Sequence, residues 1–268
     1  MMAVHYFTNL LEPKATMKKT NQIFLSVIIP SYNEKNNLKK GVLEKVHQYL
    51  SQQAYQYEII FSDDGSTDGT LEELQQFASQ HPNIIVLANE HGGKGPTVTS
   101  GMLAAKGQWR LFTDFDQSTP LSEIEKLLPS TVDNDIVIGS RAAQGAKREK
   151  EPLHRHIMGI GFNVLTQLIV LPGILDSQCG FKLFSAHATK KLFPKLYIYA
   201  RNSKVKDAFT GAFDVELLFL ARKNHLSVAE IPVIWKHAAS DRVAPIKDSL
   251  RMLRDIIRIR LASLFNKY

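Results

Sequence analysis

Short apolar runs alternate with segments of helical periodicity along the first half of the chain, and this alternation restricts the fold more than any other feature. Five such runs occupy residues 24–30, 57–61, 84–88, 109–113 and 135–139, and helical patterns separate the first four. Apolar runs of this length are typical of strands that are buried on both faces. Their alternation with helices predicts an α/β fold with a mostly parallel central sheet.

A polar cluster follows each of the first four predicted strands. The clusters are SYNE at 31–34, SDDGSTDG at 62–69, NEHGGKG at 89–95 and DFD at 114–116. Open α/β sheets bind their ligands beyond the carboxyl ends of the strands, where such loops meet. We therefore expect these four clusters to border one ligand crevice.

The DFD cluster is a candidate metal site. Asp114 and Asp116 are one residue apart at the end of a predicted strand, so their side chains share a face. Two carboxylates held this closely repel each other, and a bound cation relieves the repulsion. Oxygen ligands of this kind suit Mg²⁺ or Mn²⁺, which also bind substrate phosphates. The same pattern is common in solvated turns, so the prediction depends on its position after a buried strand.

The GGKG turn places Lys94 before a predicted helix, whose N-terminus favours anions. It is not a P-loop, because Ala88 stands at the required first glycine and Gly95 follows the lysine. Asp63 and Asp64 end the second predicted strand. A carboxylate there can accept hydrogen bonds from a ribose or a base, and aspartates beside glycine and serine also form turns and helix caps. Both interpretations stay open.

The overall charge is basic, with 33 Lys and Arg against 26 Asp and Glu and a net charge of +7. This excess suits anionic partners such as nucleic acid, phosphorylated ligands or an anionic membrane. The basic segments lack interleaved aromatic residues and a recognition helix, so we expect no nucleic-acid partner. Cys179 is the only cysteine, which excludes an intramolecular disulfide and a multi-cysteine zinc site and fits a reducing compartment.

Two stretches of the second half are candidates for membrane contact. Residues 157–175 form a run of 19 residues without formal charge, but polar side chains in its middle favour a buried or membrane-surface helix over a spanning one. Residues 246–265 predict a basic amphipathic helix with adjacent charged and apolar stripes. Such a helix can lie on an anionic membrane or pack on the core, and the pattern does not choose between them.

Several motifs occur in an order and at spacings that resemble those of inverting family-2 glycosyltransferases of GT-A fold. They are SVIIPSYNE, FSDDGSTDGT, the GGKG turn, FTDFD and IGSR. The later segments DSQCGFKLF, FDVELL and AEIPVIW are similar to the dolichyl-phosphate β-glucosyltransferases, the subgroup that glucosylates a polyprenyl phosphate. The resemblance covers about residues 24–260 and implies a GT-A-type nucleotide-sugar-binding domain with a C-terminal amphipathic helix.

The resemblance also implies roles for individual residues. The positions that match nucleotide-sugar contacts are Pro30, Tyr32, Asn33, Glu34, Asp63 and Lys94, and we expect Asp64 and Asp114 to border the same site. Asp114 and Asp116 match the metal motif, with Asp116 as the expected direct ligand. Arg141 matches a phosphate-contacting position, and Arg155, Lys182 and Arg242 are similar to basic residues that face the acceptor phosphate. Asp214 lies where many relatives place a cleft carboxylate, so it is a candidate base or acceptor-orienting residue.

Two departures from the family pattern are visible. Residues 117–120 read QSTP where related eukaryotic enzymes carry small residues. The anchoring transmembrane helix of those enzymes has no counterpart, so we expect peripheral attachment to the inner, cytoplasmic face of the membrane. We expect residues 1–22 to be a flexible extension and residues 23–268 to form a single domain. Within it, residues 23–141 would bind the nucleotide sugar and residues 142–268 the acceptor.

These features and the resemblance together predict a metal-dependent inverting glycosyltransferase that moves a hexose to a polyprenyl or dolichyl phosphate, with glucose from UDP-glucose as the first candidate. Negative charge builds on the departing diphosphate, and a divalent cation with Lys94 or Arg141 would stabilise it. The acceptor phosphate is already ionised and needs cations to steer it rather than a base. Three alternatives stay open: a GDP-mannose-dependent polyprenyl-phosphate mannosyltransferase, a transferase to a growing glycan, and a nucleotide-sugar-binding protein without turnover.

Overall fold

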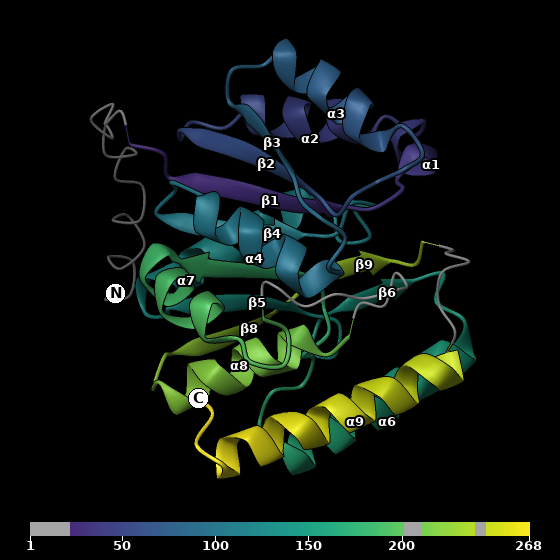
Figure 1. Cartoon of the computed structure of the whole chain (residues 1–268), viewed down its shortest axis with the longest axis vertical. Coiled ribbons are helices and arrows are strands. Elements are labelled where there is room, and N and C mark those ends of the chain that lie inside the picture. The colour runs from purple at the N-terminus through teal and green to yellow at the C-terminus, as the bar shows by residue number, and fades with distance from the viewer. Residues whose placement is uncertain (1–21, 201–210, 239–244) are drawn as a thin grey trace, which may run out of the picture.

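The computed structural model describes residues 22–200, 211–238 and 245–268 (Figure 1). Within helices it describes only the backbone of residues 154, 155 and 245–248. The predicted extension at residues 1–22 lies outside the described residues, apart from its last residue.

A seven-stranded sheet forms the centre of the protein, in the order β3-β2-β1-β4-β7-β5-β8. Its strands are β1 (Leu25–Ser31), β2 (Tyr57–Asp63), β3 (Ile84–Ala88), β4 (Trp109–Thr113), β5 (Ile136–Ser140), β7 (Phe181–Ser185) and β8 (Val228–Pro232). All neighbouring strands are parallel except that β7 runs antiparallel to both β4 and β5. The predicted α/β fold with a mostly parallel sheet is confirmed.

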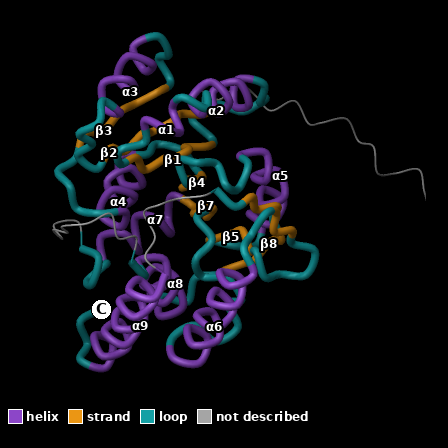
Figure 2. Tube along the Cα trace, turned by 90° about the vertical axis from the view of Figure 1, so that its right-hand side faces the viewer, coloured by secondary structure: helices purple, strands orange, loops and turns teal. Residues whose placement is uncertain are grey.

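Helices cover both faces of this sheet (Figures 1 and 2). One face packs against α4 (Lys94–Ala104), α7 (Ala186–Leu192) and α8 (Phe213–Lys223), and the other against α2 (Val42–Ser51), α3 (Thr70–Ser79) and α5 (Ile124–Leu127). Successive side chains of β1 enter the two cores in turn, with Ile28 in the first and Val27 and Ile29 in the second. A strand between two cores has no solvent-facing side, which explains its almost unbroken apolar run.

Two long helices, α6 (Leu153–Ile169) and α9 (Pro245–Leu264), lie side by side at the end of the molecule opposite α3 (Figures 1 and 2). The inward side of α9 reaches the main core through Ile256 and Ile259, which are fully buried. In the part of the chain that the structure describes, no helix is both long and apolar enough to cross a membrane.

Two segments of the sequence each form two elements in the structure. The helical pattern between the first two strands forms α1 (Lys35–Leu38) and α2, with Gly41 between them at a φ of +69°, a left-handed conformation that glycine adopts without steric cost. The segment around the AEIPVIW motif forms β8 and β9 (Ile234–Lys236). β9 pairs with β6 (Lys147–Glu149).

The strand β7 is the main feature that the apolar pattern does not identify. It comes from the DSQCGFKLF motif and inserts between β4 and β5. Its register pairs Thr113 with Phe181 and Phe112 with Lys182. β7 thereby carries residues of the second half of the chain to the end of β4, where the acidic pair lies.

Candidate active site

The acidic pair lies at the carboxyl end of β4, as the sequence predicts. Asp114 keeps 34% of its side chain exposed, and Asp116 accepts a hydrogen bond from the backbone N–H of Ser118 at 2.9 Å. Burial and the nearby charge of Asp114 raise the pKa of Asp116. The ionised form of Asp116 therefore lacks a sufficient counter-charge, which a bound cation would supply.

Gly180 forms a wall of the site beside Asp114. A Cβ at this position would overlap the carboxylate of Asp114, so the close approach requires glycine. This contact brings the DSQCG segment, from the second half of the chain, against the acidic pair of the first half. Gly180 belongs to the DSQCGFKLF motif, but no local pattern of the sequence indicates its contact with Asp114.

Lys94 is the cation that faces this acidic pair. It is the first residue of α4, and its Nζ donates a hydrogen bond to Oδ1 of Asp114. Burial disfavours the charged form of Lys94, but the carboxylates of Asp114, Asp214 and Asp116 outweigh that effect and raise its pKa. The ammonium is therefore held charged among three carboxylates at a helix N-terminus, a position suited to anions.

The acidic pair has the chemistry of a Mg²⁺ or Mn²⁺ site with few protein ligands. Among the described residues, no group of three or more His, Cys, Asp or Glu side chains is arranged to hold a metal ion. Mg²⁺ commonly binds through one or two carboxylates and takes its remaining ligands from substrate phosphates and water. The exposed carboxylate of Asp114 and the undercompensated charge of Asp116 fit such a site.

Asp64 holds the GGKG turn in place. Its buried carboxylate accepts hydrogen bonds from the backbone N–H of Gly92 at 2.8 Å and of Gly93 at 3.0 Å, and from the hydroxyl of Thr97 at 2.8 Å. Gly93 itself has a φ of +87°. Asp64 thus fixes the start of α4, and with it the position of Lys94.

Asp63 is also engaged within the protein. Its fully buried carboxylate accepts hydrogen bonds from the hydroxyls of Ser31 at 3.1 Å and Ser66 at 2.6 Å, and from the backbone N–H of Ser66 at 2.8 Å. These bonds hold the β2 loop against the end of β1. The turn-forming interpretation of the two aspartates therefore has a geometric basis.

Tyr32 stacks on the ring of His91, with 4.4 Å between centroids and 12° between planes. The Nδ1 atom of His91 lies 2.9 Å from Oδ2 of Asp64. His91 belongs to the NEHGGKG cluster, but the sequence analysis did not select it. The imidazole of His91 thus contacts Tyr32 of the SYNE cluster and Asp64 of the SDDGSTDG cluster, so it links the three loops.

The remaining residues that were predicted to contact the nucleotide sugar lie at the end of β1 and just before α1. Asn33 has a left-handed φ of +53°, and its side-chain oxygen accepts a hydrogen bond from the N–H of Thr67 at 2.8 Å. Glu34 donates its backbone N–H to the hydroxyl of Thr70 at 2.8 Å. Pro30 is half-buried and pairs in register with Ser62. The structure therefore gathers Pro30, Tyr32, Asn33, Glu34, Asp63 and Asp64 at neighbouring strand ends, which is the arrangement that the sequence predicts.

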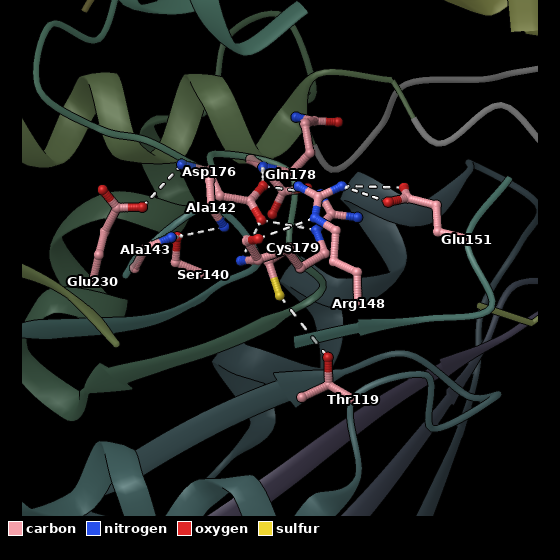
Figure 3. Close-up of polar contacts among 12 residues, drawn as sticks. Thr119, Ser140, Ala142, Ala143, Arg148, Glu151, Asp176, Gln178, Cys179 and Glu230 are labelled. Carbon is pink, nitrogen blue, oxygen red and sulfur yellow. Dashed lines mark hydrogen bonds and ion pairs between the residues drawn. The ribbon is translucent and has the colours of Figure 1, made fainter. Parts of the chain in front are cut away.

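Arg141 forms a bidentate ion pair with Asp176, whose surroundings Figure 3 shows. Its Nε and Nη2 atoms lie 2.8 and 2.9 Å from the two carboxylate oxygens, and its backbone N–H donates to Oδ2 at 2.8 Å. Burial alone would raise the pKa of Asp176, but the Arg141 guanidinium holds it well below its usual range. The guanidinium also lies 5.3 Å from the ring centroid of Trp235. Asp176 opens the DSQCG motif, yet sequence reasoning did not identify it.

Lys182 lies in an interior position that does not fit its expected contact with an acceptor phosphate. Its side chain is 0% exposed, and its Nζ donates to Oδ1 of Asp214 at 2.7 Å and to the carbonyl of Cys179. Asp214, the candidate base, is itself only 2% exposed. Cys179 is fully buried, and burial raises the pKa of its thiol to about 11.

The side chain of Arg155 and the whole of Arg242 lie outside the described residues. Lys94, Asp114 and Asp116 form the charged centre of the site, and the buried ion pair of Lys182 and Asp214 adjoins it. These residues come from four different parts of the sequence. Such an alternation of cations and carboxylates at the carboxyl end of a parallel sheet can bind a divalent cation together with a phosphorylated ligand.

Comparison with known proteins agrees with this geometry. Residues 26–193 match the model of the family described as Glycosyl transferase family 2. The chain is 34% identical to the dolichyl-phosphate beta-glucosyltransferase of Dictyostelium discoideum, over 96% of this chain and 79% of that protein. It is 32% identical to the enzyme of the same name from Saccharomyces cerevisiae, over 92% and 77%.

A similar fold occurs in glucosyl-3-phosphoglycerate synthase from Mycobacterium tuberculosis, solved with Mn²⁺ and uridine diphosphate. The match has a TM-score of 0.59 and 17% identity, and it covers 90% of this chain and 79% of that one. At this identity the likeness supports the fold alone.

Proposed function

The chain belongs to glycosyltransferase family 2 and is a glycosyltransferase, and from this premise we propose that it transfers glucose from UDP-glucose to a polyprenyl phosphate of the dolichyl type. The names of the two relatives motivate the choice of sugar and acceptor. The observation that carries the proposal is the cluster of Asp114, Asp116 and Lys94 where β4 meets the start of α4. Such a cluster suits a reaction whose leaving group is a nucleoside diphosphate, because a cation and a lysine would stabilise its negative charge.

We propose that Asp114 and Asp116 would hold Mg²⁺ or Mn²⁺, and that Lys94 would bind the donor diphosphate. The cation would supply charge stabilisation for the departing diphosphate, so no protein acid needs to protonate it. Lys94 is held in its charged form and sits on a helix N-terminus, so it is suited to an anionic ligand. Asp64 would keep it in place by fixing the GGKG turn.

The acceptor side of the proposal follows from the chemistry of a phosphate nucleophile. A phosphate monoester is already ionised, so attack on the sugar from the face opposite the diphosphate requires orientation rather than a base. Asp214 is buried and bonded to Lys182, which suits a positioning role better than proton abstraction. We propose that this pair orders the segment from Cys179 to Lys182 that lines the acidic pair.

Arg141 remains the proposed contact to the acceptor phosphate. A guanidinium has five N–H groups, and Asp176 accepts two of those of Arg141. The ion pair would orient the guanidinium while leaving other donors for a phosphate oxygen. Arg155 and Arg242 stay candidates for the same role because of the family resemblance. We propose that the lipid acceptor binds at the cytoplasmic face of the membrane.

The decisive experiment is a product assay by mass spectrometry. The purified protein is incubated with UDP-glucose, UDP-galactose or GDP-mannose, and with dolichyl phosphate, undecaprenyl phosphate or an oligosaccharide acceptor. We expect a glucosyl-phosphoryl-lipid from UDP-glucose, formed only with Mg²⁺ or Mn²⁺. Mannosyl transfer from GDP-mannose or glycan extension would replace the proposal, and nucleotide-sugar binding without any product would identify a binding protein.

A further inference from the structure

Exposed apolar side chains gather on the two helices at one end of the molecule. Among the described residues, α6 exposes Leu153, Ile157, Ile160, Val164, Leu165 and Leu168, α9 exposes Leu250, Ile257, Leu261 and Leu264, and Phe265 directly after α9 is exposed as well. The other large apolar residues with comparable exposure in the described ranges are Val132, Leu175 and Tyr197. Contiguous apolar surface of this kind marks an interaction site, whereas single exposed apolar residues are ordinary.

The spacing of these residues makes each helix two-sided. Ile157, Ile160, Val164 and Leu168 recur every three or four positions along α6, so they form one stripe. The inward side of the same helix buries Thr166 and most of Asn163. In α9 the inward side buries Ile256 and Ile259 instead. Both helices therefore pack on the core through one side and present an apolar side outward.

The two outward sides belong to neighbouring helices, because α6 and α9 lie side by side in both views (Figures 1 and 2). We call their exposed apolar residues, as listed above, the α6–α9 face. A short segment connects the end of α6 to Asp176, the partner of Arg141. The face is therefore joined in sequence to the proposed acceptor side of the active site.

The charges beside this face are basic. The side chains of Arg254 and Arg258 are 66% and 49% exposed, and Arg260 is exposed as well. The buried carboxylate of Asp255 on the same helix accepts a hydrogen bond from Tyr199 at 2.5 Å and pairs with Arg258 at 3.1 Å and Arg254 at 3.5 Å. It offsets part of the arginine charge, while the exposed guanidinium groups keep N–H donors for lipid phosphate. The sequence of α6 contains neither Asp nor Glu. Apolar side chains flanked by arginine match a bilayer with anionic headgroups, where the apolar groups enter and the arginines meet phosphate.

We propose that the α6–α9 face is a membrane-docking surface that inserts its apolar side chains into the interfacial layer of an anionic bilayer. This inference rests on the proposed function, because a polyprenyl-phosphate acceptor presents its phosphate at the headgroup plane. Insertion of apolar side chains provides the affinity, and the arginines add attraction to anionic lipid. The binding is therefore only partly released at about 1 M salt, where charges are screened within about 3 Å.

Vesicle sedimentation with a paired variant tests this surface. Leu168 and Leu264 are 77% and 65% exposed and come from the two helices, so Leu168→Asn with Leu264→Asn removes apolar contact without opening the core. We expect binding to vesicles of phosphatidylcholine and phosphatidylglycerol to fall by about 100-fold or more, since each inserted leucine contributes about a factor of ten. Val132→Asn is the matched control, because Val132 is 84% exposed but lies away from the face, and its binding should match the wild type.

A fluorescent label reports insertion directly. Cys179 is buried with a pKa raised to about 11, so an added exposed cysteine is the reactive one. An environment-sensitive dye on Leu168→Cys should shift to the blue when vesicles are added, and the same dye on Gln75→Cys, an exposed position of α3, should not. A blue-shifted dye before vesicles are added, together with a dimer by analytical ultracentrifugation, would assign the face to a second copy of the chain and overturn the proposal.

A water-soluble short-chain prenyl phosphate separates this inference from the proposed function. The paired leucine variant should keep wild-type turnover of the soluble acceptor while losing vesicle binding. Wild-type protein that binds vesicles but glucosylates neither acceptor would refute the proposed function and leave the docking surface standing. Vesicle binding that the leucine substitutions do not weaken would refute the docking surface, whatever the activity.

Discussion

Lys94 and a divalent cation would compete for the same carboxylates, those of Asp114 and Asp116. Its ammonium contacts Asp114 and lies near Asp116 and Asp214, so it neutralises part of the carboxylate charge in the absence of metal. A cation bound by Asp114 and Asp116 would displace the lysine from Asp114 and leave it free for the donor diphosphate. Under the proposed function, Lys94 would therefore oppose binding of the cation and favour binding of the nucleotide.

This competition predicts effects of opposite sign in Lys94→Met. Calorimetry with Mn²⁺ alone should show tighter binding, by a few-fold to about ten-fold, because a like charge is removed from the site. UDP binding in the presence of Mn²⁺ should weaken by about ten-fold, because a charge-assisted hydrogen bond to phosphate is lost. Lys106→Met, at an exposed lysine beyond α4, should change neither affinity. A loss of Mn²⁺ affinity in Lys94→Met would contradict this account.

Asp116→Asn tests the metal site itself. The raised pKa of Asp116 shows that its charge is costly in the absence of a cation, so the asparagine variant should keep the stability of the fold. Its transfer activity should fall by about 100-fold or more in kcat, the usual cost of removing a major electrostatic element. EDTA should abolish the activity of the wild type, and Mg²⁺ or Mn²⁺ should restore it. Full activity of Asp116→Asn in EDTA would exclude the assignment.

The Arg141–Asp176 pair predicts a pH dependence of stability. The pKa of Asp176 is depressed in the folded state below its ordinary value of 3.8, so the unfolded state binds more protons as the pH falls through that range. The stabilising contribution is thus complete above the unfolded pKa and is lost as the pH falls towards the folded one. Asp176→Asn should lower the free energy of unfolding at pH 7 by about 3 kcal/mol, because it leaves the Arg141 charge unpaired.

Urea denaturation at several pH values measures this effect. In the wild type the free energy of unfolding should decline below about pH 4, and Asp176→Asn should reduce that decline because its own titration is removed. Asp133→Asn, at an exposed aspartate, serves as the control. If the free energy of unfolding of Asp176→Asn declined below about pH 4 as steeply as in the wild type, other carboxyl groups would dominate the acid unfolding.

At the scale of elements, helix α8 carries two acidic residues in its first turn, and both are bonded to side chains or backbone beyond the helix. Asp214 binds Lys182 of β7. Glu216 is fully buried and accepts hydrogen bonds from the N–H groups of Tyr197 and Ile198 at 2.8 Å and of Tyr199 at 3.0 Å. One carboxylate thus holds three successive residues of the preceding segment against the helix.

Glu216→Gln should therefore destabilise the fold by about 2–3 kcal/mol. The amide NH₂ cannot accept the N–H of Tyr199, and hydrogen bonds to a charged acceptor are worth about 1.5–3 kcal/mol. Chemical denaturation followed by circular dichroism gives the free energy of unfolding. Glu72→Gln, at an exposed position in the first turn of α3, should change it by no more than about 0.5 kcal/mol. Equal effects of the two substitutions would show that the Glu216 contacts contribute little.

At the scale of the whole molecule, the two halves expected from the sequence share one sheet. β7, from the second half, lies between β4 and β5 of the first and is the only strand that pairs with both in the described sheet. The boundary at residue 141 separates the proposed donor and acceptor roles in the sequence. In the sheet, however, strands from before and after residue 141 are hydrogen-bonded neighbours. We therefore expect residues 23–141 to need the second half of the chain for their fold.

A fragment of residues 23–141 should accordingly fail to fold cooperatively. Without β7, β4 and β5 lose their common neighbour, and Asp114 loses the wall formed by Gly180. We expect a broad urea transition for the fragment and no calorimetric binding of UDP with Mn²⁺, whereas the full chain should unfold in one sharp transition. A fragment that unfolds cooperatively and binds UDP would identify residues 23–141 as an autonomous domain.

The sequence by itself determined the features that depend on neighbouring residues. Apolar runs and helical periodicity located most strands and helices, because both patterns are local, and β3 and β4 have the predicted bounds. The acidic pair and the GGKG turn could be identified in the same way, since a strand end or a helix start is visible in the sequence. The family motifs added the expected roles of these loops.

Only the tertiary structure decided which charged residues meet. Arg141 with Asp176, Lys182 with Asp214 and Lys94 with Asp114 are pairs between distant segments, and no local pattern specifies them. The insertion of β7 decides the position of Lys182, and it also brings the preceding Gly180 against Asp114, because β7 pairs with β4. The terminal helix shows the same limit: its sequence allowed packing or membrane contact, and its position beside α6 buries one side while leaving the apolar stripe outside.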